Sequence, residues 1–434
     1  MSLAAVKQAS LFVFFAQVQM RSGLIQTRPV TTKGDNMKVF KNTVLATAMT
    51  LSFAVCAPAS AQGKDLKVGL LLPFSQVFAA YGEAIKEGFD LAIEEAGGQV
   101  AGRKIVVLKE DSKEDPKVSL QMVRRYTKDD NVDFIVGPIA SHVVAAIRDE
   151  VHRSKTFLLV ANAGNNEITG KNCSPYIVRT SFSNWQVNHS MGQYAAENIG
   201  KSALTVSANY DSGREQAGAF RQGFMEKGGK APQEEWPALG TADFAPIITS
   251  IRAKQAEVDM VWSFLAGSAA PRFITQVTQA GVRGPKLKLM GPVYMADELF
   301  FPAMGDAALG VLVSGHYMAS LDTPRNRAFQ ARFQKKYNKV AHVMHVQGYD
   351  TAKLMLATVE ALKGDLSDKA KVRKTLTSIQ VDSPRGYFRI DPRTGNVVQN
   401  IYIGEVIKRA DGALGHKILK TYEQVTDKGE GCAL

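Results

Sequence analysis

The regular alternation of short apolar segments with amphipathic segments limits this chain to a small set of folds. Leu66–Leu72 is a Leu-rich run of strand length, and Lys104–Leu108 is a second one. Between them, from Tyr81 to Ala96, apolar residues recur at spacings of three and four, which predicts an amphipathic helix. Asp115-Pro116 then supplies an N-cap and a first-turn proline for the next helix. The pattern continues with an expected strand at 132–136, helix at 141–153 and strand at 156–160. This rhythm is typical of a parallel sheet with helices on both faces.

The same alternation starts again after about residue 200, which indicates a second α/β unit. Its expected strands are 203–207, 258–264, 286–290 and 310–314, and its expected helices are 214–227 and 270–280. Helices expected at 324–337 and 346–362 lie too far along to belong to the second sheet alone, and 386–409 is a predicted hairpin that turns at Arg393–Asn396. We therefore predict two lobes joined by several crossings. The first has residues 62–180 plus about 320–376, the second has 181–319 plus about 377–409, and 410–434 is a tail near the hinge.

The first 61 residues have the organisation of a leader. Basic residues after Met37, a run of 12 apolar residues over Val44–Val55, and small residues up to Ala61 form the three parts of a secretory signal. We expect translation to start at Met37 and cleavage to follow Ala61. The apolar run is too short to span a bilayer, which takes about 20 residues. Cys56 leaves a lipoprotein as an alternative, although Val55 stands where such a signal needs a small residue.

The charge of the chain gives no sign of a nucleic-acid partner. The formal net charge of the full chain is +12, and removal of the leader leaves 47 basic and 40 acidic residues. These charges alternate along the chain, as in the run Lys109–Asp115, whereas a nucleic-acid binder gathers basic residues on one face. We therefore expect an exported protein with a mixed, solvated surface.

Two cysteines, Cys173 and Cys432, lie outside the leader. In an oxidising compartment they permit one disulfide between a mid-chain loop and the C-terminal region. A buried thiol and a separate exposed thiol are the alternative. Of the two, we expect the disulfide.

Motifs for catalysis and for cofactors are absent from the sequence. The segment after the first strand lacks Gly-x-Gly-x-x-Gly, and neither a phosphate-binding P-loop nor Gly-x-Ser-x-Gly occurs anywhere. His342 and His345 could share a helix face, but no glutamate stands between them as in a zinc enzyme. We expect ordinary surface or cleft histidines, no metal, no cofactor and no catalytic residue. Binding is favoured over catalysis.

Several short motifs, taken in order, resemble a known family. They are Lys67–Pro73, Tyr81-Gly82, Gly97–Ile105, Val136-Gly137-Pro138, Asn165–Thr169, Tyr176–Thr180 and Gly348-Tyr349-Asp350. Over about residues 64–409 the chain is similar to periplasmic proteins of the Leu/Ile/Val-binding type. The resemblance implies a bilobed α/β fold of type I that closes on a small ligand, acts as a monomer in the periplasm, and passes the ligand to an ABC permease in the inner membrane.

The site can be approached from both the topology and the resemblance. Ligands of open parallel sheets lie outside the carboxyl ends of the strands, and Ser141 begins a helix there, where N–H groups and the helix dipole attract an anion. Ser141 could equally be a plain N-cap. The resemblance assigns ligand contacts to Tyr81, Ser141, Asn162, Ala163, Gly164, Tyr210, Ser268 and Val293, and Tyr294 adds an aromatic ring beside Val293.

The ligand class depends on what holds a ligand's charge. In the amino-acid binders of the family an acid stands where this chain has Val293, and threonine is usual where it has Gly164. Burying an ammonium without a counter-charge costs several kcal/mol. We therefore expect an amino-free carboxylic acid, with a benzoate or cinnamate derivative as the leading candidate. A branched-chain or other amino acid is the alternative, if Asp297 or Glu298 reaches the ammonium. A sensor ectodomain and an exported enzyme are the remaining alternatives.

Overall fold

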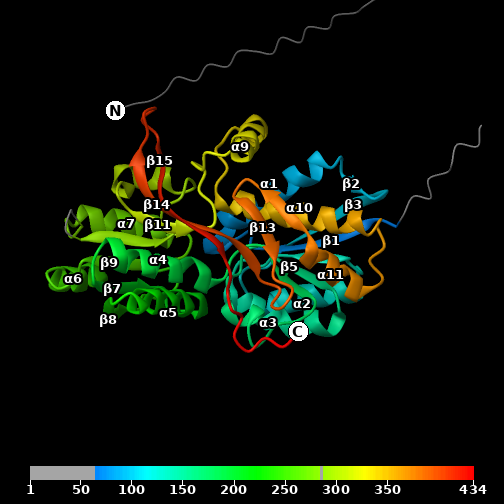
Figure 1. Ribbon diagram of the computed structural model, residues 1–434, viewed down its shortest axis with the longest axis horizontal. Helices are drawn as coiled ribbons and strands as arrows, with labels where there is room; N and C mark the ends of the chain where they lie inside the picture. Colours follow the sequence, from blue (N-terminus) through cyan, green and yellow to red (C-terminus); the bar gives the residue numbers. More distant parts are fainter. Residues whose placement is uncertain (1–63, 284–286) are drawn as a thin grey trace, which may run out of the picture. The chain divides into compact units, whose positions relative to one another are not determined.

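The computed structural model describes residues 64–283 and 287–434, so the predicted signal segment and its cleavage site lie outside the described residues. Two sheets organise the described chain (Figure 1). The first has six strands in the order β2-β3-β1-β4-β5-β6, and all its pairings are parallel except β2 with β3. Its strands are β1 (Leu66–Leu72), β2 (Gln99–Val100), β3 (Arg103–Asp111), β4 (Phe134–Val136), β5 (Phe157–Val160) and β6 (Ile177–Arg179).

The second sheet has nine strands in the order β12-β13-β14-β11-β10-β9-β7-β8, with β15 also paired to β14. Pairings from β8 to β11 are parallel, and those that involve β12 to β15 are antiparallel. Its strands are β7 (Ser202–Ser207), β8 (Lys230–Glu235), β9 (Met260–Phe264), β10 (Lys288–Pro292), β11 (Leu312–Gly315), β12 (Gln380–Ser383), β13 (Gly386–Ile390), β14 (Val397–Lys408) and β15 (Leu414–Val425). The predicted hairpin around Arg393–Asn396 is confirmed as β13 and β14.

Eleven α-helices occur among the described residues. They are α1 (Ala79–Glu95), α2 (Pro116–Lys128), α3 (Ser141–Ser154), α4 (Asn184–Asn198), α5 (Asp211–Glu226), α6 (Ala245–Lys254), α7 (Ala269–Gln279), α8 (Phe301–Met304), α9 (Pro324–Tyr337), α10 (Val343–Ala361) and α11 (Lys369–Ser378). As predicted, Asp115 caps α2, because its side chain accepts from two N–H groups of the first turn. None of these helices is long and apolar enough to cross a membrane.

Each sheet has one pair of closely packed helices beside it. On the first sheet α1 packs against α10, and a Cβ on Gly88 would lie 1.8 Å from the carbonyl oxygen of His345. On the second sheet α4 packs against α5, and a Cβ on Gly192 would lie 2.2 Å from the carbonyl oxygen of Phe220. Glycine is thus required where the two helix backbones touch. Because α10 packs on α1, the chain returns to the first sheet's side after residue 320, as the sequence predicts.

A buried ion pair links the chain segments that cross from one sheet to the other. Arg385 and Asp350 are almost fully buried, with Nε of the arginine 2.8 Å from Oδ2 of the aspartate. The same guanidinium donates to the carbonyl oxygens of Thr180 (2.6 Å) and Ser181 (3.0 Å), where the chain leaves the first sheet. Burial raises the pKa of Asp350 to about 6 against the opposing charge of Arg385. Two crossings are therefore fixed to each other and to α10.

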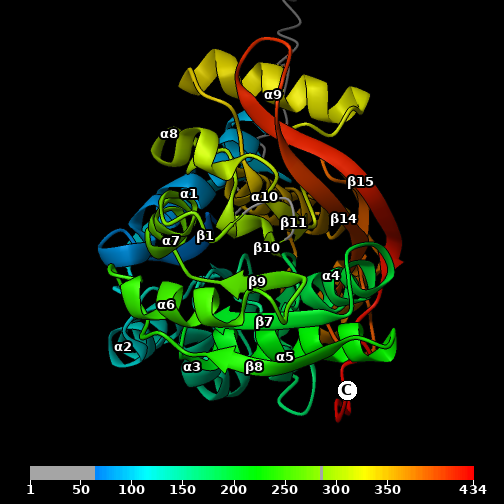
Figure 2. The ribbon, with the colours of Figure 1, turned by 90° about the vertical axis from the view of Figure 1, so that its left-hand side faces the viewer.

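The C-terminal region differs from the predicted tail. Residues Leu414–Val425 form β15, which pairs along most of β14 in the second sheet, and Figure 2 shows the two strands as one long curved ribbon pair. The following residues return to the first sheet's side, where Cys432 bonds Cys173 with their Cα atoms 5.5 Å apart. The predicted disulfide is confirmed. The residue ranges of the two lobes stay a prediction.

Candidate ligand-binding pocket

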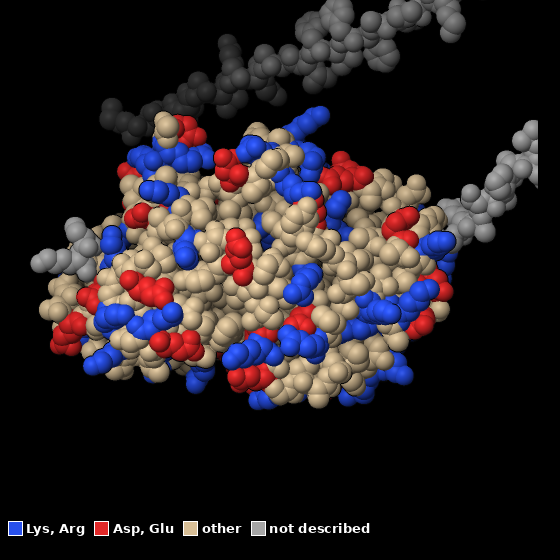
Figure 3. Space-filling view, viewed as in Figure 1, with Lys and Arg blue, Asp and Glu red and all other residues tan. Residues whose placement is uncertain are grey.

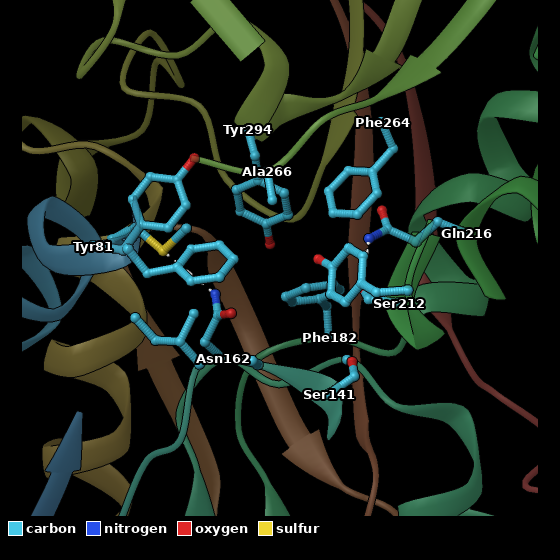
Figure 4. Close-up of a pocket in the computed structure, with 15 residues that line it drawn as sticks. Tyr81, Ser141, Asn162, Phe182, Ser212, Gln216, Phe264, Ala266 and Tyr294 are labelled. Atoms are coloured by element: carbon cyan, nitrogen blue, oxygen red, sulfur yellow. Dashed lines mark hydrogen bonds between the residues drawn. The ribbon is translucent and has the colours of Figure 1, made fainter. Parts of the chain in front are cut away.

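A pocket lies where loops from the carboxyl ends of strands in both sheets meet (Figure 4). This is the position that the doubly wound topology favours for a ligand. The first sheet's side contributes Phe78, Tyr81, Ile139, Ala140, Ser141, Asn162, Gly164, Phe182 and Met344. The second sheet's side contributes Tyr210, Ser212, Gln216, Phe264, Ala266 and Tyr294. The space between them that a water-sized sphere can occupy is about 30 Å³, so the two sides lie close together.

The pocket is polar at one side and largely aromatic elsewhere. Figure 4 shows Ser141, Ser212 and Gln216 on one side and Tyr81 on the opposite side, with Phe182 between them. The rings of Phe182 and Tyr294 have centroids 5.3 Å apart. Aromatic rings at such distances bury large apolar surfaces and bind other rings well. The pocket is therefore suited to a flat apolar body with one polar end.

None of the described side chains that line the pocket is Asp, Glu, Lys, Arg or His. Burial raises the pKa of each of the three lining tyrosines, Tyr81, Tyr210 and Tyr294, above its usual value, so their hydroxyls stay protonated. The Tyr294 hydroxyl accepts from Nε2 of Gln347 at 3.3 Å, whereas no described side chain is hydrogen-bonded to the buried Tyr81 hydroxyl. The pocket thus offers neutral hydrogen-bond donors and no fixed charge.

Two helices, one from each side, begin at the polar end of the pocket. Helix α3 starts at Ser141 and α5 starts at Asp211, followed by Ser212. The first N–H groups of a helix lack partners within it, and the dipole favours an anion there. Ala140 is the N-cap of α3, so the Ser141 hydroxyl is not needed for capping, and it lies 3.5 Å from Nδ2 of Asn184. An anionic group placed here would meet N–H and hydroxyl donors from both sides.

Residues around Gly164 explain why this position is a glycine. A Cβ there would lie 2.3 Å from Oδ1 of Asn184 and 2.8 Å from Cε2 of Phe182. Both distances are shorter than any normal contact, so neighbouring side chains occupy the volume of a side chain at 164. The Asn162 amide beside it donates to Oε1 of Gln347 at 2.8 Å and is already engaged in the protein. This wall of the pocket is therefore rigid and ring-lined.

A model of the periplasmic binding protein family matches residues 65–413, which is most of the chain. The chain belongs to the periplasmic binding protein family. Leu/Ile/Val-binding protein homolog 6 of Brucella melitensis is 30% identical over 377 residues, covering 86% of this chain and 95% of that protein. This periplasmic binding protein thus matches its relative over nearly the relative's whole length.

Two solved solute-binding proteins of ABC transporters are also similar to this periplasmic binding protein. One, from R. palustris in complex with benzoate, has a TM-score of 0.79 and 30% identity, and covers 85% of this chain and all of its own. Another, from Rhodopseudomonas palustris HaA2 in complex with p-hydroxybenzoic acid, has a TM-score of 0.78 and 32% identity, with 85% and 99% covered. The type I bilobed fold expected from the sequence is confirmed.

The structure brings six of the nine expected site residues into the pocket of this binding protein. These are Tyr81, Ser141, Asn162, Gly164, Tyr210 and Tyr294. Three do not line it. Ala163 is buried behind the pocket with its carbonyl oxygen facing Arg179, and Ser268 stands at the N-cap position of α7. The side chain of Val293 turns toward Gly315, where a Cβ would meet it at 2.7 Å.

The argument from Val293 is therefore corrected. The pocket is neutral because of all the residues that line it, and Val293 points elsewhere. Asp297 and Glu298 also lie outside the lining. Burial and the nearby Glu298 charge raise the pKa of Asp297 well above its usual value, which disfavours the charged carboxylate there.

Sequence reasoning missed several lining residues, among them Phe182, Ser212, Gln216 and Met344. Ser212 could have been found, because it follows the first strand of the second unit at a helix start. Phe182 lies on a crossing segment and Met344 at the start of α10, and no local pattern marks either as part of a site.

A second hollow, which we call the groove, lies on the other side of α1. Its lining includes the charged or titratable residues Glu83, Glu87, Glu298, Asp306, Asp322, Arg327, Lys339, His342, His345, Lys408 and Arg409. Both histidines line this groove, as the cleft half of the expectation has it, and both are buried. His342 is the N-cap of α10 and His345 completes its capping box, and burial lowers both pKa values well below the usual range. No group of three His, Cys, Asp or Glu side chains in 64–283 and 287–434 is placed to hold a metal ion.

On the surface, charges of both signs are mixed. Figure 3 shows Lys and Arg side chains lying beside Asp and Glu side chains over the face in view. Ion pairs include Arg125 with Asp130 (3.2 Å) at the end of α2, and Lys109 of β3 with Glu83 of α1 (3.2 Å). Exposed pairs of this kind contribute little to stability.

Proposed function

We propose that this protein captures an aromatic carboxylic acid between its two lobes and delivers it to an ABC permease. The observation that carries the proposal is the uncharged lining of the pocket. An α-amino acid would bring an ammonium group that meets no carboxylate among these residues, at a cost of several kcal/mol. A carboxylate, in contrast, is well served by the starts of α3 and α5.

The ring-lined body of the pocket supports an aromatic rather than an aliphatic acid. Phe182, Tyr294, Tyr81 and Phe264 all line the pocket, so a ligand bound there meets aromatic rings. Solved proteins of 30–32% identity are complexes with benzoate, 3,4-dihydroxybenzoic acid and p-hydroxybenzoic acid, which supports the same class. The unpartnered Tyr81 hydroxyl, opposite the polar end, suits a hydroxyl group on the far side of the ring.

The second candidate is an amino-acid ligand, because relatives such as Leu/Ile/Val-binding protein homolog 6 carry that name. For such a ligand the ammonium has to rely on neutral acceptors alone, for example Oδ1 of Asn184 beside Gly164. A location in the periplasm, cleavage after Ala61 and action as a monomer complete the proposal. We infer binding without chemistry, which sets this protein apart from an exported enzyme.

Calorimetry with four related ligands tests the proposal. Benzoate and 4-hydroxybenzoate are expected to bind the purified protein, whereas benzamide, which has the same shape without the charge, binds weakly. Leucine is expected not to bind. A ligand that binds only the folded state also raises the melting temperature, so thermal shift provides an independent measurement. Micromolar leucine binding together with no benzoate binding would overturn the proposal.

A further inference from the structure

Phe182 is the one lining residue on a segment that crosses between the lobes, and its position is unusually well fixed. Nη1 of Arg385 (3.0 Å) and Nε2 of Gln399 (2.8 Å) both donate to the carbonyl oxygen of Ser181 before it. Ser183, after it, caps α4 through a reciprocal capping box with Gln186. The backbone on both sides of Phe182 is therefore held, and its ring has little freedom to move away from the pocket.

The ring of Phe182 is also supported from behind. It stacks on the imidazole of His316, with centroids 5.5 Å apart and planes at 15°, and burial lowers the pKa of His316 well below its usual value. The imidazole is therefore neutral, and Gln347 contacts its Nε2 at 3.2 Å. Phe182 also lines the pocket, so the ring of an aromatic ligand bound there can lie against it beside Tyr294, whose ring centroid is 5.3 Å away.

Gly164 is the position that admits this ring. Because a Cβ at 164 would lie 2.8 Å from Cε2 of Phe182, the ring and a side chain at 164 exclude each other. Because position 164 has no side chain, the ring of Phe182 fills this space. The ring lies between the polar end of the pocket and Tyr81. Asn184, which bounds the same space, lies 3.5 Å from the Ser141 hydroxyl, so the surface begins beside the anion end.

We propose that Phe182 is the specificity-determining residue that makes this pocket select flat carbon skeletons, and that Gly164 is glycine in order to admit it. The inference rests on the proposed function. It adds the residue by which the pocket distinguishes one carboxylic acid from another. A planar ring next to the carboxylate lies against Phe182 over its whole face. A puckered, saturated ring of similar size meets the same surface at fewer atoms and binds less well.

Affinities of benzoate and cyclohexanecarboxylate for the wild type and for Phe182→Leu test this directly. Ring stacking is worth about 0.5–1.5 kcal/mol beyond buried area, so the wild type should prefer benzoate by about two- to tenfold on this account. Leucine keeps most of the apolar volume and removes the flat surface. The preference for benzoate should then fall to near unity in Phe182→Leu, with loss of benzoate affinity and little change for the saturated acid.

Phe273→Leu, a substitution in the core of α7 away from the pocket, is the matched control and should leave the preference unchanged. If Phe182→Leu does not fold, Phe182→Met is measured instead, because methionine adapts to irregular space. A folded variant that keeps the full preference for benzoate overturns the inference. A wild type that binds neither acid overturns the proposed function instead, so the two failures are distinguishable.

Discussion

Helix α1 separates two hollows of opposite character. Toward the pocket it presents Tyr81, in a lining without charge, and toward the groove it presents Glu83 and Glu87 among many charged residues. The neighbouring carboxyl groups of Asp297 and Glu298 show a similar contrast, because their pKa values are shifted in opposite directions. Burial and the charge of Glu298 raise the pKa of Asp297, whereas the charge and hydrogen bond of His416 lower the pKa of Glu298 against the opposing effect of burial.

The contrast teaches that burial and pairing, rather than sequence composition, decide where charge is tolerated. Groove carboxylates have partners, as Glu87 has His345 at 3.0 Å and Glu298 has His416 at 3.2 Å. The pocket offers no such partner, so a charged group there has to arrive with the ligand and be met by neutral donors.

The largest expected effect comes from adding charge to the pocket. Gln216→Glu keeps the side-chain shape but places a carboxylate beside Ser212, to which the glutamine amide now donates at 2.9 Å. Two like charges about 5 Å apart at an effective dielectric of about 20 repel by about 3 kcal/mol. We expect benzoate affinity to fall about 100-fold by calorimetry.

Gln334→Glu makes the same change on the exposed groove side of α9 and serves as the control. Its affinity for benzoate should stay within about twofold of the wild type, because exposed charges interact weakly. Equal affinities in Gln216→Glu and the wild type would mean that Gln216 lies too far from the ligand to matter.

Gly267 is one of the places where the two sides of the pocket touch. At φ +58° a Cβ on Gly267 would lie 2.4 Å from the carbonyl oxygen of Val77, across the mouth of the pocket. Gly267→Ala should prevent full closure, lower affinity about tenfold, and enlarge the ligand-bound protein in small-angle scattering. Gly281→Ala is the control, since φ is +66° there and nothing lies within 4 Å of its Cβ. Both variants carry a similar backbone strain of about 1–3 kcal/mol, so strain alone would lower affinity equally in both. An equal change of affinity in the two variants would therefore contradict the explanation from closure.

A smaller effect is expected at the anion end. Ser141→Ala removes a hydroxyl that can donate to a carboxylate, which is worth about 1–2 kcal/mol, or about five- to thirtyfold in affinity. Because Ala140 is the N-cap, the melting temperature should barely change. Ser154→Ala at the other end of α3 is the comparison variant, and unchanged affinity in Ser141→Ala would remove this hydroxyl from the site.

Asp297 and Glu298 should respond to pH with opposite signs. The folded-state pKa of Asp297 is raised, so wild-type stability falls as pH rises from about 4, where the unfolded side chain ionises. Asp297→Asn should therefore gain on the wild type as pH rises, by about 1 kcal/mol per unit of pKa difference. Glu298→Gln should be destabilised at pH 7, and its deficit should shrink as pH falls below about 4. Urea unfolding between about pH 2 and pH 8 measures both, and parallel pH curves for the two variants would contradict this assignment.

Much of the fold could be predicted because each local signal agreed with the tertiary structure. The strand β1 and helix α9 have the expected bounds, and Asp115 caps α2 as its Asp-Pro pair indicated. Strand β15 was missed because it lies at an edge and carries charged residues such as Lys417, Lys420 and Glu423, which obscure any alternation.

The site was predicted where topology fixes it and missed where side-chain direction decides. Ser141 and Asn162 follow strands of one parallel sheet, so their place at the strand ends is set by the fold. Val293 and Tyr294 are adjacent in a short turn after β10, yet only the tyrosine faces the pocket. No repeat of apolar residues in the sequence shows which of the two side chains faces the pocket. Phe182 lines the pocket because of how tertiary contacts hold the segment that crosses between the lobes.

The disulfide has a consequence for how the protein reaches its mature form. Cys432 follows Cys173 by 259 residues, and the whole second sheet is encoded between them. Cys173 is synthesised first and has no bonding partner until the chain through Cys432 has been made. Until then it is open to mixed disulfides with small thiols or with other chains. The bond can therefore form only in a chain that extends through Cys432. A chain that stops before Cys432 keeps a reactive thiol at Cys173, which a thiol-labelling reagent would detect.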